Sequence, residues 1–576
     1  MRKLLYTLLL AAFVVPVSAF AQTYGADTLF VTPDQAGSIG ALNNAIQGDT
    51  TTDGKDYNHH VFVLQRGSTY YLNGWITIKP GTHVELMGQP KPSTGTDMGP
   101  AAVVEGTVSG LYYNYTIDCF GDFSMKNVWM LYATDLGTKN WTSLQFETDS
   151  LKTTGGPVGV FENCIFDWPT GIAVTANCKN LTLTFNKCIF RNCIDPTQWW
   201  AGRAFATVNA NASVDSIAYV NCTLENMGFG DQDDYVPPKS AWFNHNTFVN
   251  IAKFAFKYYW FTKLVVVNNV FVNCHFTGER YADRIGQDPD RYLYGAVIDC
   301  DTIPDTLTYN GINAQNEANQ RVFIFTNNSN YTDPMFQTFY NSYNDTVTTG
   351  NQGKILAEPM MNTRTLDMFT WHKLFKISGI HDSTDPGFVN AATNKDSILS
   401  FLGARYVTGK NVDWSYPSSD SELSLLWPLR ENLAYTNQTL LTAGMGGYPL
   451  GDLYHWFPTQ YATWSAQQTQ ENQAISKLTG IVAISGTVPV GYTLSQNYPN
   501  PFNPSTEILY SLPRNGFVTL KVFNVLGQEV ETLFSGMAHA GNYKVVFDGA
   551  RLASGVYFYR LDAGSTAITK KMILMK

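Results

Sequence analysis

The chain is poor in charge. Charged residues make up 15% of its 576 residues, below the quarter that is usual in proteins, so Asn, Thr, Ser, Gln and Gly must carry much of the surface. The 38 basic and 47 acidic side chains argue against nucleic acid or an anionic membrane as partner. No apolar run after the N-terminus approaches the length that spans a bilayer, so we predict no transmembrane segment.

Common catalytic and metal-binding sequence motifs are also missing. The eight cysteines lie between Cys119 and Cys300 without a Cys-x-x-Cys pair, and the nine histidines form no cluster, so no metal site is predicted. Buried thiols are favoured over disulfides, because free cysteine packs as a small hydrophobe. The sequence contains no nucleotide-binding glycine loop, nucleophile elbow or His-Glu-x-x-His phrase.

The N-terminus predicts export. Arg2 and Lys3 precede an apolar run over 4–17 and the small-residue sequence at 19–21, which together indicate a secretory signal peptide over residues 1–21. The length of the remaining chain suggests two or three domains.

A short strand-like phrase recurs in the middle of the chain. If Cys164, Cys188, Cys222, Asn246 and Asn269 are equivalent, the steps between copies are 24, 34, 24 and 23 residues. A period near 24 is the length of one rung, and a rung cannot bury its apolar face unless others stack on it.

Asn follows the strand in four copies, at positions 192, 226, 250 and 273. Asn tolerates left-handed backbone geometry, which suits a bend between strands, and stacked rungs would align these side chains into a ladder. The period and the Asn positions resemble the right-handed parallel β-helix of the pectate-lyase superfamily. Leucine-rich repeats are the nearest alternative, but their Leu-x-x-Leu-x-Leu phrase is missing. We place the solenoid at about 28–400.

Residues 401–480 are rich in aromatics and end in a polar stretch at 460–478 that is predicted to be helical. Exposed solenoid ends need covering, so this region is expected to cap the last rung. The Gly/Pro/Val-containing segment 481–492 is predicted to be a linker.

The last part of the chain has the alternation of half-buried strands, with prolines at its entrance and glycines at its turns. Its phrases Asn497–Pro504, Val525–Val530 and Leu552–Tyr559 and its basic end resemble the type A C-terminal sorting domain of the bacterial type IX secretion system, over about 491–576. The resemblance implies an immunoglobulin-like β-sandwich at 493–576, passage through the periplasm, contact with the secretion machinery, and removal of the domain or surface attachment. The residues that carry the expected sorting signal are Gly527, Gly555, Lys570, Lys571 and Lys576.

Catalytic residues are harder to find. The Gly-His-Gly and Arg-Ile-Lys elements of polygalacturonase-type hydrolases are absent. A polysaccharide lyase needs a base and a positive group that neutralises a uronate, supplied by Arg or by calcium held on Asp oxygens. Two segments have suitable residue types: the first contains Asp231, Asp233 and Asp234 with Lys253 and Lys257 about one rung later, and the second contains Arg280, Arg284 and Arg291.

We favour the interpretation that both segments are surface loops without a catalytic role. Ion pairs within such loops contribute little to stability. We therefore predict a secreted or surface β-helix that binds glycans or contributes to adhesion, without a cofactor and without an identified catalytic site. The alternative is a lyase acting on acidic glycans, for which calcium would be the cofactor.

Overall fold

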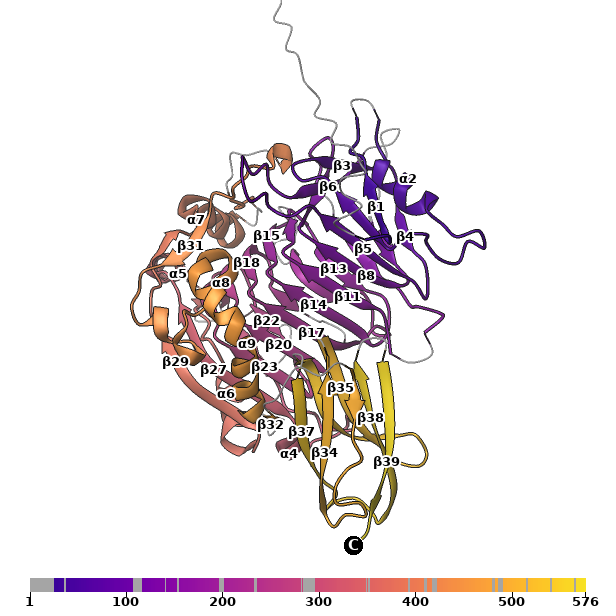
Figure 1. The fold of residues 1–576 in the computed structure, drawn as a ribbon. Coiled ribbons are helices and arrows are strands. Elements are labelled where there is room, and N and C mark those ends of the chain that lie inside the picture. Colours follow the sequence, from indigo (N-terminus) through magenta and orange to yellow (C-terminus); the bar gives the residue numbers. More distant parts are fainter. Residues whose placement is uncertain are drawn as a thin grey trace, which may run out of the picture.

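The computed structural model describes most of the chain beyond its N-terminal segment. The described residues are 25–35, 38–106, 117–139, 141–152, 155–195, 201–232, 236–280, 282, 296–348, 350, 353–391, 394–408, 412–416, 422–478, 482–484, 491–513, 516–538, 541–563 and 566–576. The predicted signal peptide lies outside them. Figure 1 shows a long coil of stacked strands, helices along one side, and a separate sandwich at the C-terminus.

The coil is a parallel β-helix, as the repeat predicted. One wall is an eight-stranded parallel sheet, and a 19-stranded sheet with two arms forms the rest. The eight strands are β4 (Ile76–Ile78), β7 (Ile117–Cys119), β10 (Thr142–Phe146), β13 (Ile172–Ala176), β16 (Arg203–Thr207), β19 (Asp231–Gln232), β22 (Phe256–Lys257) and β26 (Ile298–Asp299).

In the 19-stranded sheet, the first arm contains β1 (Thr28–Val31), β2 (Val61–Leu64), β5 (His83–Gly88), β8 (Asp122–Lys126), β11 (Val158–Glu162), β14 (Leu181–Asn186), β17 (Val214–Val220), β20 (Ser240–Asn244) and β23 (Lys263–Val267). The second arm contains β3 (Thr69–Leu72), β6 (Ala101–Glu105), β9 (Val128–Thr134), β12 (Ile165–Asp167), β15 (Ile189–Cys193), β18 (Thr223–Met227), β21 (Thr247–Ile251) and β24 (Val270–Cys274). The last two strands, β27 (Val322–Tyr331) and β29 (Phe375–Asp382), run through both arms.

Left-handed residues make the bend between the two arms. The bend residues have φ between 51° and 62° and are Asn127, Asn163, Lys187, Asn221, His245, Asn268 and Asn327. A second left-handed position, with φ of 52–54°, is occupied by Asn192, Asn226, Asn250 and Asn273. The prediction that Asn serves these bends is confirmed, and its physical basis is the low cost of left-handed geometry for Asn.

The rungs stack their side chains in columns. Phe161, Phe185, Tyr219 and Phe243 form one aromatic column, with successive ring centroids 5.0, 4.9 and 5.2 Å apart. All eight cysteines belong to the described residues, and each is buried with a free thiol. Cys164, Cys188 and Cys222 occupy equivalent positions in successive rungs, and Asn246 and Asn269 occupy the same position in the next two. We call these Asn side chains the Asn ladder, in which the amide of Asn246 donates to Asn269 at 2.9 Å.

The two ends of the coil differ. Helix α2 (Ala41–Gly48) covers the first rung, where Leu42 and Ile46 are fully buried. The rungs end with β29 at Asp382, before the expected boundary at 400.

The chain also forms short elements outside the rungs. The helices are α4 (Glu317–Gln320), α5 (Pro334–Asp345), α6 (Thr363–Trp371) and α7 (Lys395–Gly403), and the short strands are β25 (Glu279–Arg280), β28 (Ile355–Leu356), β30 (Phe388–Asn390) and β31 (Asn432–Tyr435).

The described residues of the region after the rungs lie along the flank of the coil, whereas the sequence led us to expect a cap on the last rung. Helices α8 (Leu453–Trp456) and α9 (Pro458–Leu478) appear in orange beside the rungs in Figure 1. Trp464, which is 1% exposed, shares a cluster with Trp242 and Val265 of the coil. The reason is that these strands carry apolar side chains on their outer face as well, and this second apolar surface must also be buried.

A buried cluster of ionisable side chains joins the flanking segment to the coil. Arg191 of the coil lies 3.4 Å from Glu431 of the flanking segment, 3.7 Å from Asp167 and 3.9 Å from Glu225. Burial raises the pKa of Asp167 to about 6, and burial also raises the pKa of Glu225 well above its usual value. Arg191 is the shared partner of all three carboxyl groups, and its contact with Glu431 links the coil to the flanking segment.

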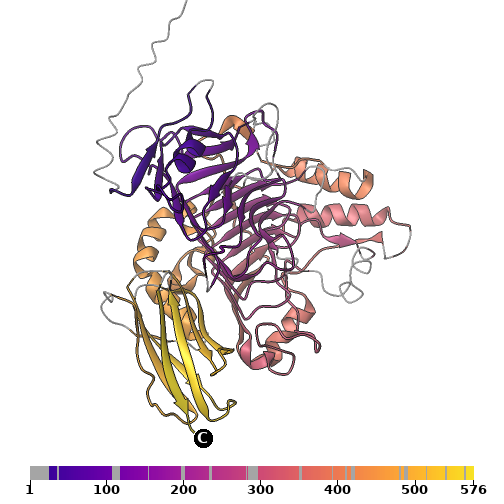
Figure 2. The ribbon, with the colours of Figure 1, turned by 90° about the vertical axis from the view of Figure 1, so that its right-hand side faces the viewer.

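The C-terminal module is a sandwich of two antiparallel four-stranded sheets, as predicted. One sheet contains β32 (Val482–Ile484), β33 (Thr493–Leu494), β34 (Ser505–Leu512) and β37 (Gly541–Asp548), and the other contains β35 (Gly516–Phe523), β36 (Glu529–Ala538), β38 (Gly555–Ala563) and β39 (Thr566–Leu574). The expected linker at 481–492 therefore includes a strand, since β32 pairs with β37. Figure 2 shows the sandwich packed beside the coil.

Candidate functional site

Asp231, the first predicted lyase residue, lies inside the coil. It is fully buried, and the parallel register places it between Phe205 and Phe256, two residues of the hydrophobic core. Asp231 interacts with the hydroxyl of Tyr219, whose pKa is raised by burial and by this carboxyl group. Asp231 is therefore part of the interior and does not face a groove.

The two predicted lysines lie elsewhere. Lys253 forms an ion pair with Glu279 at 2.8 Å. Lys257 lies 4.7 Å from the ring centres of both Phe254 and Tyr259. Successive residues of a strand face opposite sides, so Lys257, one position beyond the register partner of Asp231, points outward. The structure does not bring Asp231 and Lys257 onto one surface.

The second charged segment is described only at its start. Arg280 lies 5.8 Å from the ring centre of Tyr406, on the short strand β25. Four of the predicted residues lie outside the described part of the chain: Asp233, Asp234, Arg284 and Arg291.

The residues of the expected sorting signal are spread over one half of the sandwich. Gly527 occupies the turn between β35 and β36 with φ of 77°, which requires glycine or a strained residue. Gly555 begins β38, and Lys570 and Lys571 lie on β39. Lys576 donates from Nζ to the carbonyl of Ala550 at 2.6 Å.

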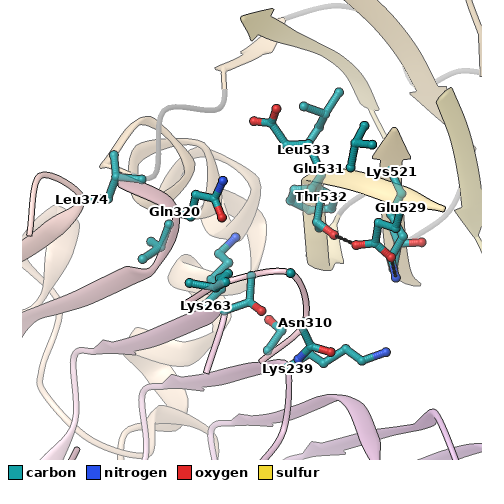
Figure 3. A pocket seen from close by; sticks show the side chains of 18 of the residues that line it. Lys239, Lys263, Asn310, Gln320, Leu374, Lys521, Glu529, Glu531, Thr532 and Leu533 are labelled. Carbon is teal, nitrogen blue, oxygen red and sulfur yellow. Dashed lines mark hydrogen bonds and ion pairs between the residues drawn. The ribbon is translucent and has the colours of Figure 1, made fainter. Parts of the chain in front are cut away.

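A cavity of about 240 Å³ lies between the coil and the sandwich (Figure 3). Lys263 of β23 stands 5.2 Å from the ring centre of Phe534 on β36, and burial lowers its pKa to about 8. Burial, and then the charge of Asp548, raise the pKa of Glu531 on the opposite wall to about 7. The walls come from the coil and the sorting module together, so this cavity belongs to their interface.

A different surface has the features of a binding site. On the outer side of β4, β7, β10 and β13, six residues form what we call the tryptophan face: Trp75, Thr77, Asp118, Trp141, Glu147 and Asn177. Trp75 is 49% exposed and Trp141 is 38% exposed. Both follow the outward alternation of their strands, since Ile76, Ile78 and Leu144 between them belong to the core.

Hydrogen bonds order the polar part of this face. The Nδ2 group of Asn177 donates to both carboxylate oxygens of Glu147, at 3.1 and 2.9 Å, and the Nε2 group of Gln145 donates to the same carboxylate. Asn209, one rung further, donates to the Oδ1 atom of Asn177 at 2.5 Å. The ladder holds Glu147 in one orientation on the same face as the tryptophans, six residues beyond Trp141 along the chain and therefore about 20 Å from it.

Asp118 lies in the same row. It is the register partner of both Thr77 and Gln145, and burial followed by the charge of Glu147 raises its pKa to about 6. Within the described residues, its buried Oδ1 atom has no hydrogen-bond partner. A carboxyl group in this environment keeps its proton to a higher pH than an exposed one.

Sequence reasoning missed this face. A signal was present, since the alternation in Trp75–Ile78 and Trp141–Glu147 places a tryptophan on the same side of a strand as polar residues. However, the repeated phrase covers the two arms of the large sheet, and nothing in it gives the register between β4, β7 and β10.

The described residues contain no group of three or more His, Cys, Asp and Glu side chains placed to hold a metal ion. The helices in the described part of the chain are all too short or too polar to cross a membrane.

Comparison with known proteins recognises the C-terminal module. Residues 496–575 match the family model for the secretion system C-terminal sorting domain. No curated protein and no solved structure matches the chain. The matched domain is that of the type IX secretion system, which implies interaction with its machinery. The chain therefore carries a type IX secretion system C-terminal sorting domain, and the protein is exported to the cell surface or secreted.

Proposed function

We propose that this exported β-helix binds a glycan on the tryptophan face. The observation that carries the proposal is the position of two exposed tryptophans on the same surface as an ordered carboxylate and amide ladder. A sugar ring has apolar C–H faces that pack on aromatic rings, and a rim of hydroxyl groups that pair with carboxylates and amides. Trp75 and Trp141 would supply the first kind of contact, while Glu147 and Asn177 would supply the second.

Adhesion to polysaccharide outside the cell is the role that such binding would serve. The export signal supports it, because an exported protein can meet the polysaccharides outside the cell. The lyase alternative gains no support from the described residues, since Asp231 lies in the interior and Lys253 pairs with Glu279.

The test is affinity electrophoresis through gels that contain neutral or acidic polysaccharides. We expect the wild-type protein to be retarded by at least one of them, and the double variant Trp75→Ala/Trp141→Ala to bind about tenfold more weakly or worse, since aromatic contacts contribute about 1 kcal/mol each. Trp371→Ala is the matched control, because Trp371 is 44% exposed and lies on α6, away from the face. Equal retardation of the double variant and the control contradicts the proposal.

A further inference from the structure

We propose that the tryptophan face is also a hydrolytic site, at which Asp118 and Glu147 cleave a glycosidic bond of the bound glycan. This inference rests on the proposed function, because the glycan must first bind there.

The geometry provides two carboxyl groups on one open surface. Asp118 pairs in register with Gln145, and Glu147 follows two residues later on the same side of the strand. A rung spacing of about 4.8 Å and a rise of about 3.3 Å per residue place the two Cα atoms about 8 Å apart. Both side chains leave the sheet on the same face, so the separation of their carboxyl groups is on the scale of this Cα separation. Inverting glycosidases need their carboxyl groups roughly 6.5–9.5 Å apart, which leaves room for a water molecule beside the sugar.

The surroundings give the two carboxyl groups different roles. Glu147 accepts hydrogen bonds on both oxygens from Asn177 and a further one from Gln145, so it acts as an acceptor. Asp118 has a raised pKa, and the charged group that faces it is Glu147. The raised pKa suits Asp118 to the role of the acid, and the hydrogen bonds that orient Glu147 as an acceptor suit it to the role of the base.

In the proposed step, Asp118 donates its proton to the glycosidic oxygen as the bond from that oxygen to the anomeric carbon breaks. Glu147 takes a proton from a water molecule, and the water oxygen forms the new bond to the anomeric carbon. The products are two shorter glycans, one with a new reducing end, and the configuration at the anomeric carbon inverts. Proton exchange with solvent restores both groups.

The charge of the face indicates the class of glycan. Two neighbouring carboxyl groups disfavour a uronate-rich chain. Lys79, the next outward residue after Thr77, stands 4.7 Å from the ring centre of Tyr57 and donates to the carbonyl of Asp56 at 3.2 Å, so it is engaged by these two residues. The substrate is therefore a neutral polysaccharide, in contrast to the acidic glycan that a lyase would need.

The experiment measures new reducing ends after full-length protein is incubated with xylan, mannan, β-glucan, pectate or alginate. We expect release from at least one neutral polymer, with kcat falling above about pH 6 as Asp118 loses its proton. The variants Asp118→Asn and Glu147→Gln should each lower kcat at least 100-fold, since proton transfer by a positioned group contributes about 10²–10⁴. Asp382→Asn, on the exposed last strand, is the control.

Affinity electrophoresis of the same proteins separates the two proposals. Retained binding by Asp118→Asn, together with lost hydrolysis, supports the catalytic assignment and shows that this variant is folded. Glu147 also contributes to binding, so Glu147→Gln should lose hydrolysis by a larger factor than it loses binding. Binding by the wild type without reducing ends from any polymer overturns hydrolysis and leaves the binding function standing. Hydrolysis at the wild-type rate by either variant overturns the assignment of that residue.

Discussion

The Asn ladder inside the coil can be tested at Asn269. Its Oδ1 atom accepts hydrogen bonds from the backbone N–H and the side-chain Nδ2 of Asn246, both at 2.9 Å. Its own Nδ2 group donates to the carbonyls of Val267 and Phe243 at 2.9 and 3.1 Å, and to Asn328 at 3.0 Å. Both Asn246 and Asn269 are fully buried.

Asn269→Ala removes all of these side-chain bonds. The side chain of Asn246 keeps its hydrogen bond to the carbonyl of Tyr219. The backbone N–H of Asn246, however, loses its acceptor and is left buried without a partner. One unsatisfied buried donor costs about 1–3 kcal/mol, and the lost bonds to the carbonyls and to Asn328 add about 2 kcal/mol. We therefore expect the free energy of unfolding to fall by about 3–5 kcal/mol.

The assay is urea unfolding followed by far-ultraviolet circular dichroism. Asn211→Ala is the control, because Asn211 is exposed, and it should change the stability by less than about 0.5 kcal/mol. Asn269→Cys should cost less than Asn269→Ala, since Cys222 in the same column accepts the backbone N–H of Cys188 on its thiol. If Asn269→Ala is as stable as the control, the ladder does not stabilise the coil and the reasoning fails.

Three further predictions concern the outer contacts of the coil and the export of the protein. Asp97 accepts hydrogen bonds from Arg66 and from Trp427 of the flanking segment, and these lower its pKa to about 2. The stability that this carboxylate contributes is therefore present above about pH 4 and is lost as the pH falls toward 2. Hydrogen exchange of the flanking segment should rise over that range in the wild type and show no such step in Asp97→Asn. Deletion of 491–576 should expose Lys263 and return its pKa from about 8 toward its usual value of 10.5, as measured by NMR of the methylated lysine, whereas an unchanged pKa would contradict docking of the module on the coil. The same deletion should leave the protein in the periplasm, and cell fractionation measures where the protein is found. Unchanged export would refute the role of the module.

Several features of this fold are encoded locally and could be predicted. The equivalence of Cys222, Asn246 and Asn269 followed from the repeated motif in which they occur. The structure stacks them as neighbours, because each copy of the motif carries its own bend residue. The sorting module was recognisable for the same reason, since its turn glycines and strand alternation are contiguous in the sequence.

Other features depend on contacts between distant residues. Asp231 lies on a strand of two residues, too short for alternation to show which side faces the core. The site of Trp464 on the flank required knowledge that Trp242 points outward, more than 200 residues earlier in the chain.

The sequence by itself determined that this is an exported, Asn-laddered coil with a C-terminal sorting module, because those properties are written in short repeated phrases. Only the tertiary structure decided which side chains share a surface. One face of the coil carries Asp118, Glu147, Trp75 and Trp141, because loops of unequal length bring β4, β7 and β10 into register. The hydrogen bonds that set this register form only when the rungs stack.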